Sequence, residues 1–259
     1  MQATTPLSAT ATANTTAPRA AQPAAVPGRR TIDAPMRMFH WLFALSFLGA
    51  YLTADGERWR MLHVTLGYTM AGLLGFRILY GLFGPKQASL SALWRKLSGA
   101  PAWLKSLRTA TSLSAMPWRQ GQNLLMALAI VALLVLVLPL TLSGYATYND
   151  WGDALGGEWL EEVHELFGNL MLALVLGHLG LIAALSVLRR QNQAAPMLTG
   201  RVAGPGPDLV KQNRGWLAAL VLLAVLAFGA WQWQQSPKGL IPTQPFAHSP
   251  TQTHGEDDD

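Results

Sequence analysis

The chain has 259 residues, of which 51% are apolar and only 13% charged, so it is too apolar for an ordinary soluble domain and indicates several membrane spans. It contains no cysteine, which excludes disulfides, thiolate-ligated iron–sulfur clusters and the C-x-x-C-H attachment of c-type haem. The formal charge of +5 is segregated along the chain as a membrane topology requires, so no nucleic-acid partner is needed to explain it.

The chain begins with a polar segment and continues into two hydrophobic spans. Residues 1–33 are rich in Ala, Thr and Pro and lack the apolar core of a signal peptide, so they predict a disordered tail. The first span covers residues 39–52, after a proline, and the second covers 61–83, before the stop signal at Pro85. The polar turn between the spans is short, so the two helices are expected to pack antiparallel.

A basic segment and the most apolar span come next. Residues 85–120 interleave lysine and arginine with three tryptophans. This pattern favours a helix lying on anionic headgroups, and the alternative is a docking site for an acidic protein. The third span, residues 123–146, contains no histidine, and its Pro139 is tolerable in lipid where neighbouring helices satisfy the freed carbonyl.

The second half of the chain holds two further spans. An acidic loop leads into the fourth span at residues 163–188. Residues 191–215 form a Gly/Pro-rich cytoplasmic linker, and the fifth span at 216–233 is flanked by tryptophans, as interfacial anchors often are. Residues 234–259 predict a disordered acidic tail on the periplasmic side.

The basic residues predict the orientation of the spans. With the amino terminus inside, fifteen of the nineteen Lys and Arg fall on the inner side, and twelve of the fourteen acidic residues fall on the outer side. The positive-inside rule therefore predicts a cytoplasmic amino terminus and a periplasmic carboxyl terminus. No organelle-targeting signal is present, so the predicted location is a bacterial inner membrane.

Four histidines lie within the predicted spans. His164 and His178 are fourteen residues apart on the fourth span, which places them on nearly one helix face and about 21 Å apart along the axis. The simplest use of this arrangement is to supply one axial ligand to each of two haems. His63 shares the outer level with His164, and His40 would complete the inner pair with His178.

Two alternatives to haem ligation are a position at headgroup level and binding of another metal. A single histidine at a helix end is usually a headgroup-level residue, whereas an ionisable group as deep as His178 indicates function. Residue counts place His178 about 16 Å deep and His40 only about 9 Å, which makes the inner pair the weaker of the two. Zinc or non-haem iron would need three or four ligands at one point, and these histidines divide into two distant pairs. The two remaining histidines, His248 and His254, lie in the polar tail, where solvation is expected.

Glycine and arginine residues add to the haem hypothesis. Gly67 and Gly168 each follow a histidine by four residues, which would let a flat macrocycle approach the backbone on the same face. Close packing between membrane helices would equally explain them. Arg37 and Arg77 at the inner level are placed to pair with haem propionates, although snorkelling to the interface also fits.

The sequence resembles the bacterial cytochrome b561 and NiFe-hydrogenase cytochrome b subunit family. The resemblance covers roughly residues 33–190 and lies in Pro35-Met36-Arg37-Met38-Phe39-His40-Trp41, His63-Val64-Thr65-Leu66-Gly67-Tyr68, Gly75-Phe76-Arg77-Ile78-Leu79-Tyr80-Gly81, and the pair His164 and His178. It implies an all-α, four-helix transmembrane domain at residues 34–190 that holds two b haems. The fifth transmembrane helix, predicted from hydropathy, goes beyond this four-helix pattern. The family roles map onto His40, His63, His164 and His178 as haem-iron ligands.

The same resemblance implies a place in a respiratory electron-transport chain. Quinone or quinol would exchange electrons through the haems with a redox partner, such as a cytochrome c or a dehydrogenase or hydrogenase subunit. On this interpretation the chain is an electron-transfer protein, or the cytochrome b subunit of a quinone-linked oxidoreductase. The alternatives are a membrane transporter, which would show polar groups along a path near the midplane, and an assembly or scaffold subunit without haem.

Overall fold

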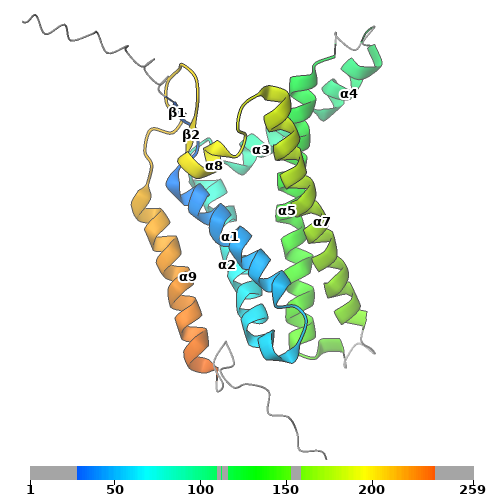
Figure 1. Cartoon of the computed structure of the whole chain (residues 1–259), viewed down its shortest axis with the longest axis vertical. Coiled ribbons are helices and arrows are strands. Elements are labelled where there is room, and N and C mark those ends of the chain that lie inside the picture. The colour runs from blue at the N-terminus through cyan, green and yellow to red at the C-terminus, as the bar shows by residue number, and fades with distance from the viewer. Residues whose placement is uncertain (1–27, 110–111, 113–115, 153–158, 237–259) are drawn as a thin grey trace, which may run out of the picture.

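The structure is a computed structural model that describes residues 28–109, 112, 116–152 and 159–236. Its long helices run side by side (Figure 1). They are α1 (Ala34–Leu52), α2 (Arg60–Phe83), α5 (Trp118–Tyr148), α7 (Trp159–Arg189) and α9 (Gly215–Gln235). These five helices cover the five predicted hydrophobic segments and extend each by a few residues. Most of the two predicted disordered tails, residues 1–27 and 237–259, lies outside the described residues.

Four helices among the described residues are long and apolar enough to cross a membrane. They are α2 with the short turn before it (Glu57–Phe83), α5, α7 and α9. The prediction of an all-α membrane protein is therefore confirmed. Helix α1 is not one of the four, because its 19 residues include the polar side chains of Arg37 and His40. At about 1.5 Å per residue it is nearly as long as a bilayer core is thick, so a fifth crossing through α1 stays a prediction.

Local signals explain where α1 begins and ends. The Asp33 side chain accepts a hydrogen bond from the Met36 backbone N–H at 3.3 Å and caps the helix, and Pro35 occupies its first turn. At the other end the Thr53 hydroxyl donates to the Gly49 carbonyl oxygen at 2.7 Å. Gly49 also lets α2 approach closely, because a Cβ placed there would lie 2.8 Å from a methyl carbon of Leu66.

One apolar cluster joins four of the helices into a bundle. Its buried members come from α1, α2, α5 and α7, and they are Phe47, Met70, Leu74, Leu136, Val137, Leu140 and Met171. Two of them, Val137 and Met171, are 0% exposed. A second cluster joins Phe39 of α1 and Leu73 of α2 to Val221 of α9, so α9 packs against the outside of this bundle (Figure 1).

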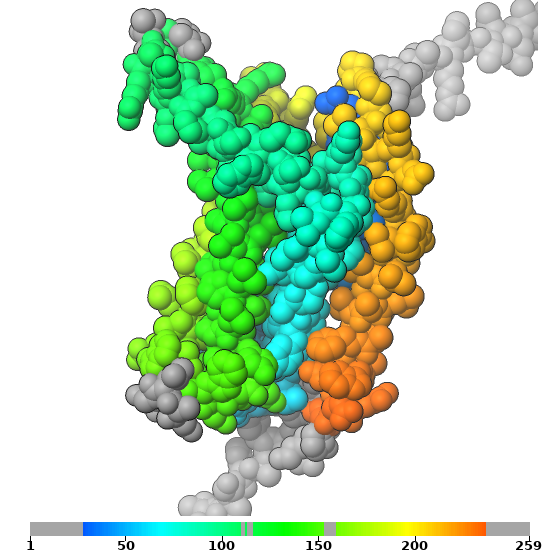
Figure 2. Space-filling model, turned by 180° about the vertical axis from the view of Figure 1, so that it is seen from behind, coloured from blue at the N-terminus to red at the C-terminus, as the bar shows by residue number. Residues whose placement is uncertain are grey.

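Short elements gather at one end of the bundle. They are α3 (Leu90–Leu97), α4 (Ala100–Thr109), α8 (Ala195–Thr199), β1 (Arg29–Arg30) and β2 (Arg201–Val202), and the 3₁₀ turn η1 (Glu57–Trp59) lies at the opposite end. In Figure 2 the blue-green segment of α3 and α4 covers the upper end of the bundle. The basic segment of the sequence is therefore helical in two short pieces.

The predicted limits of the tail and the linker differ from the structure at this end. Residues 28–33 are ordered, because β1 pairs with β2 in antiparallel register and the Arg30 N–H donates to the Asp208 carboxylate at 2.6 Å. The prediction of a disordered tail is therefore wrong for these six residues. The predicted linker likewise contains α8 and β2. Elements as short as β1, α8 and β2 leave no periodic pattern in a sequence, so hydropathy does not predict them.

Candidate functional site

Two histidines from different helices meet near one end of the bundle. His63 lies in the first turn of α2 and His164 near the start of α7, and both helices begin at the lower end in Figure 1. Their ring centroids are 5.9 Å apart and the ring planes cross at 86°. Two imidazoles that bind one metal ion from opposite sides, with metal–nitrogen bonds of about 2 Å, place their centroids roughly 6 Å apart. The observed separation therefore suits a shared iron.

Backbone carbonyls set the tautomer of both rings. The Nδ1 atom of His63 lies 2.8 Å from the Ala50 carbonyl oxygen, and that of His164 lies 3.1 Å from the Leu140 carbonyl oxygen. A carbonyl oxygen can only accept, so each Nδ1 carries the hydrogen and each Nε2 keeps its lone pair. The same arrangement orients histidines that bind metals in proteins. Both rings are thereby prepared to ligate iron through Nε2.

Helix α5 holds the His164 ring in place. The Ser143 hydroxyl lies 3.2 Å from His164 Nδ1 and donates to the Leu140 carbonyl oxygen at 3.1 Å. A Cβ built on Gly144 would lie 2.7 Å from His164 Cε1, so only glycine leaves room for the ring here. Sequence reasoning singled out neither Ser143 nor Gly144, because the third span carries no histidine and the contact crosses between helices.

Replacing Gly144 by alanine is expected to push the His164 ring out of this position. The added methyl group overpacks the contact, so the free energy of unfolding should fall by about 1–3 kcal/mol. Any haem bound to His164 should show an altered electron paramagnetic resonance (EPR) signal. Gly229→Ala on α9 is the matched control, because its Cβ meets no described heavy atom within 4 Å. An unchanged EPR signal in Gly144→Ala would show that this glycine does not position the ring.

The second predicted pair also comes together. His40 of α1 and His178 of α7 are half-buried and lie within electrostatic range of each other. The residue counts suggested different depths, but α7 extends beyond the start of α1 at this end of the bundle (Figure 1), which offsets the difference. The Nδ1 atom of each ring is buried and has no hydrogen-bond partner among the described residues. Buried ring nitrogens of this kind usually have a partner, so these two rings suit a ligand between the helices.

The glycines of the bundle fall into two groups. A Cβ built on Gly67 or Gly168 meets no heavy atom of the described residues within 4 Å, although both positions are half-buried. A Cβ built on Gly49 or Gly144, in contrast, would clash with a side chain of a neighbouring helix. The two predicted glycines therefore border open space in the described structure, as a macrocycle against the backbone would require, whereas close helix packing explains the other two.

The two predicted arginines lie at the end of the bundle where α1 begins. Arg37 donates from Nη1 to the Leu198 carbonyl oxygen at 3.0 Å, and its buried Nε has no partner among the described residues. Arg77 is 6% exposed and lies within electrostatic range of Asp33. Its buried Nη1 atom has no hydrogen-bond partner among the described residues. Both side chains therefore retain a donor for a further acceptor. No group of three or more His, Cys, Asp or Glu gathers as a metal site in the described ranges.

Comparisons with known proteins give one match. A family model described as prokaryotic cytochrome b561 matches residues 31–200. This range contains both histidine pairs and the four helices of the bundle, and it ends before α9. No curated protein and no solved structure matches the chain.

Proposed function

Because this chain belongs to the prokaryotic cytochrome b561 family, we propose that it is a di-haem cytochrome carrying electrons between the membrane quinone pool and a redox partner protein. Membership of the family makes it a multi-pass bacterial membrane protein that binds b-type haem and transfers electrons. The proposal adds the number of haems, their ligands and the exchange with quinone.

The geometry of His63 and His164 is the observation that carries the proposal. Their 5.9 Å separation and the carbonyl-bound Nδ1 atoms leave two Nε2 lone pairs to hold one iron between α2 and α7. We assign a second haem to His40 and His178, whose buried ring nitrogens lack partners among the described residues. When bound, the haems supply one-electron carriage, and two histidine ligands on each iron leave no open position for oxygen.

The spacing along α7 supports a path of electron transfer across the bilayer. His164 and His178 are separated by about 21 Å along the helix axis, so the two haem sites lie at different depths of the bilayer. With the amino terminus in the cytoplasm, as the charge distribution predicts, the His63–His164 site faces the periplasm. Electron movement between the sites then runs across the membrane and works with or against about 2.3 kcal/mol per 100 mV of membrane potential.

Other side chains complete the proposed haem sites. Gly67 and Gly168 leave room for the macrocycles beside α2 and α7, because a Cβ there meets no described atom within 4 Å. Arg37 and Arg77 each offer a buried nitrogen to an acceptor such as a haem propionate. The partner protein is a cytochrome c or a dehydrogenase or hydrogenase subunit.

Placing a bulky side chain beside a haem site tests this use of the glycines. Gly168→Leu is expected to fill the space next to His164, lowering the haem-to-protein ratio from about two to about one while the helix content stays unchanged. The matched control is Gly229→Leu on α9, which also borders open space. Full haem content in Gly168→Leu would show that no macrocycle lies against this glycine.

A quinol oxidation assay tests the function itself. The purified protein is reconstituted in liposomes, a short-chain quinol is added, and haem reduction is followed in the α-band of the absorption spectrum. Both haems should be reduced by the quinol to nearly the extent reached with dithionite. Haems that dithionite reduces and quinol does not would contradict the quinone assignment, and a folded parent without haem would favour the transporter or scaffold interpretations.

A further inference from the structure

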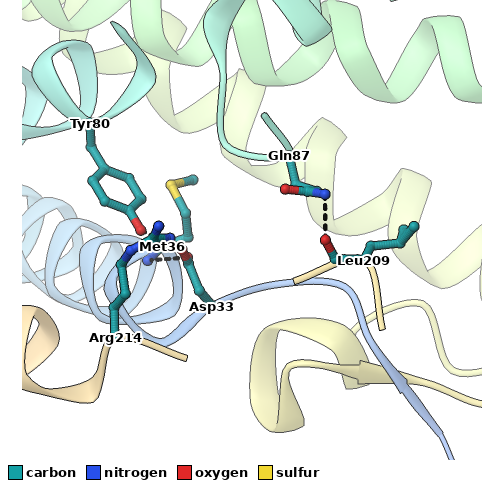
Figure 3. A network of polar contacts seen from close by, with 6 residues as sticks. All are labelled: Asp33, Met36, Tyr80, Gln87, Leu209 and Arg214. Atoms are coloured by element: carbon teal, nitrogen blue, oxygen red, sulfur yellow. Dashed lines mark hydrogen bonds and ion pairs between the residues drawn. The ribbon is translucent and has the colours of Figure 1, made fainter. Parts of the chain in front are cut away.

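A buried carboxylate joins three helices at the end of the bundle where α1 begins. Asp33 is 2% exposed and caps α1 through the Met36 backbone N–H. The Tyr80 hydroxyl of α2 donates to the same carboxylate, and Arg214 at the start of α9 lies 3.7 Å from it. Figure 3 shows these side chains pointing toward one another from three elements. We call Asp33, Tyr80 and Arg214 the Asp33 clamp.

The backbone reinforces the clamp between α1 and α9. The Ala34 N–H donates to the Asn213 carbonyl oxygen at 3.0 Å, directly beside the ion pair. Arg214 itself adopts a left-handed conformation with φ of 46°, which costs free energy for any residue with a side chain. Such a conformation persists where tertiary contacts determine it. Its contact with a buried carboxylate therefore gives a physical reason for an arginine where glycine would fit the backbone better.

An apolar contact extends the clamp toward a proposed haem ligand. Val221 of α9 belongs to the same buried apolar cluster as Phe39, which directly precedes His40 on α1. Asp33 and His40 are seven residues apart, or about two helical turns, so they lie on nearly the same side of α1. Helix α9 thus contacts α1 both at its capped end and beside His40, although it lies outside the bundle that carries the histidines.

We propose that Asp33 is a positioning residue for His40, and that α9 acts through the Asp33 clamp to hold the haem-ligating part of α1 against the bundle. The inference rests on the proposed di-haem function, and it gives α9 a role within the electron-transfer unit. Removing the carboxylate leaves the buried Arg77 and the half-buried Arg214 without their shared anion. The loss is expected to be destabilising chiefly through Arg77, because a buried charge is then left uncompensated.

Substitutions that separate charge from helix capping test the proposal. Asp33→Asn keeps a good capping residue but removes the charge, and Arg214→Gly suits the left-handed backbone but removes the guanidinium. Both are expected to weaken retention of the His40–His178 haem by about tenfold or more, as substitutions behind metal ligands do. Arg214→Lys, which keeps the charge, should retain that haem. Asp208→Asn is the matched control, because it alters an exposed carboxylate at the same end of the bundle.

The readout must report on one haem at a time. EPR spectra of the oxidised protein are expected to contain two low-spin signals, and the one that His178→Ala removes belongs to the His40–His178 haem. That signal should weaken or shift in Asp33→Asn and Arg214→Gly, while the signal of the His63–His164 haem stays unchanged. Two unaltered signals in both variants would overturn the positioning role.

A second measurement reads the clamp without relying on haem. The chain lacks cysteine, so spin labels can be attached to Leu45→Cys on α1 and Leu220→Cys on α9, where the side chains are 60% and 56% exposed. Asp33→Asn should broaden the distance distribution between the labels, and an unchanged distribution would contradict the clamp. A parent without haem would overturn the proposed function, and these distances would then decide by themselves whether Asp33 ties α9 to α1.

Discussion

Replacing His164 by alanine is expected to lower the haem-to-protein ratio from about two to about one. The ring supplies one of the two Nε2 atoms proposed to hold an iron between α2 and α7. The ring centroid of the other ligand, His63, lies 5.9 Å away, and His63 cannot complete the coordination alone. His63→Ala should therefore lose the same haem. The ratio is measured by a haemochrome assay on purified protein, with helix content checked by circular dichroism.

The tail histidines provide the control for this experiment. His248→Ala changes the same residue type in the polar carboxyl-terminal segment and should keep both haems. Retention of two haems in His164→Ala and His63→Ala would contradict the assignment of this pair. Loss of different haems in the two variants, seen as different surviving EPR signals, would contradict the pairing while leaving haem binding intact.

Replacing His178 by alanine is expected to remove the other haem and to stop electron transfer across the bilayer. The His63–His164 haem should stay, because its ligand on α7, His164, lies about 21 Å away from His178 along the helix axis and its other ligand comes from α2. In liposomes that enclose an electron acceptor, quinol oxidation from outside should then fall to the background rate of empty vesicles. The assay follows reduction of the enclosed acceptor.

A polar residue on the same helix gives the matched control. Ser186→Ala removes a hydroxyl that donates to the Ile182 carbonyl oxygen and accepts from the Gln193 backbone N–H, both at the end of α7 beyond His178, and it should leave haem content and transfer unchanged. Transfer at the parent rate in His178→Ala, with its haem absent, would show that the second site lies outside the electron path.

Much of the fold follows from hydropathy and from the residues that start and stop helices. Runs of apolar residues with few charges must be helical in lipid, because every backbone group needs an internal hydrogen bond there. This argument placed α5, α7 and α9 within a few residues of their ends. The pairing of His63 with His164 was also predictable, since the second and fourth spans both begin at the outer surface, which brings residues near their starts to one level. Helix α1 shows the limit of hydropathy, because its polar side chains keep it below the composition of a membrane span.

The contacts that hold the site were beyond the reach of sequence patterns. The Ala50 and Leu140 carbonyl oxygens bind the histidines through main-chain atoms, which carry no residue signature. Gly144 matters because of a ring on another helix. Asp33 before Ala34-Pro35 is a recognisable capping signal. Its contact with Arg214, however, joins distant parts of the chain and depends on how α9 packs.

The most direct test of the account is the number and spin state of the haems in the purified parent protein. A reduced-minus-oxidised spectrum, combined with the haem-to-protein ratio and EPR, gives both quantities in one preparation. The account predicts about two b-type haems per chain, both low-spin, as two histidine ligands to each iron require. A folded parent with one haem, or with a high-spin iron that binds carbon monoxide readily, would contradict the two bis-histidine sites proposed for α1, α2 and α7.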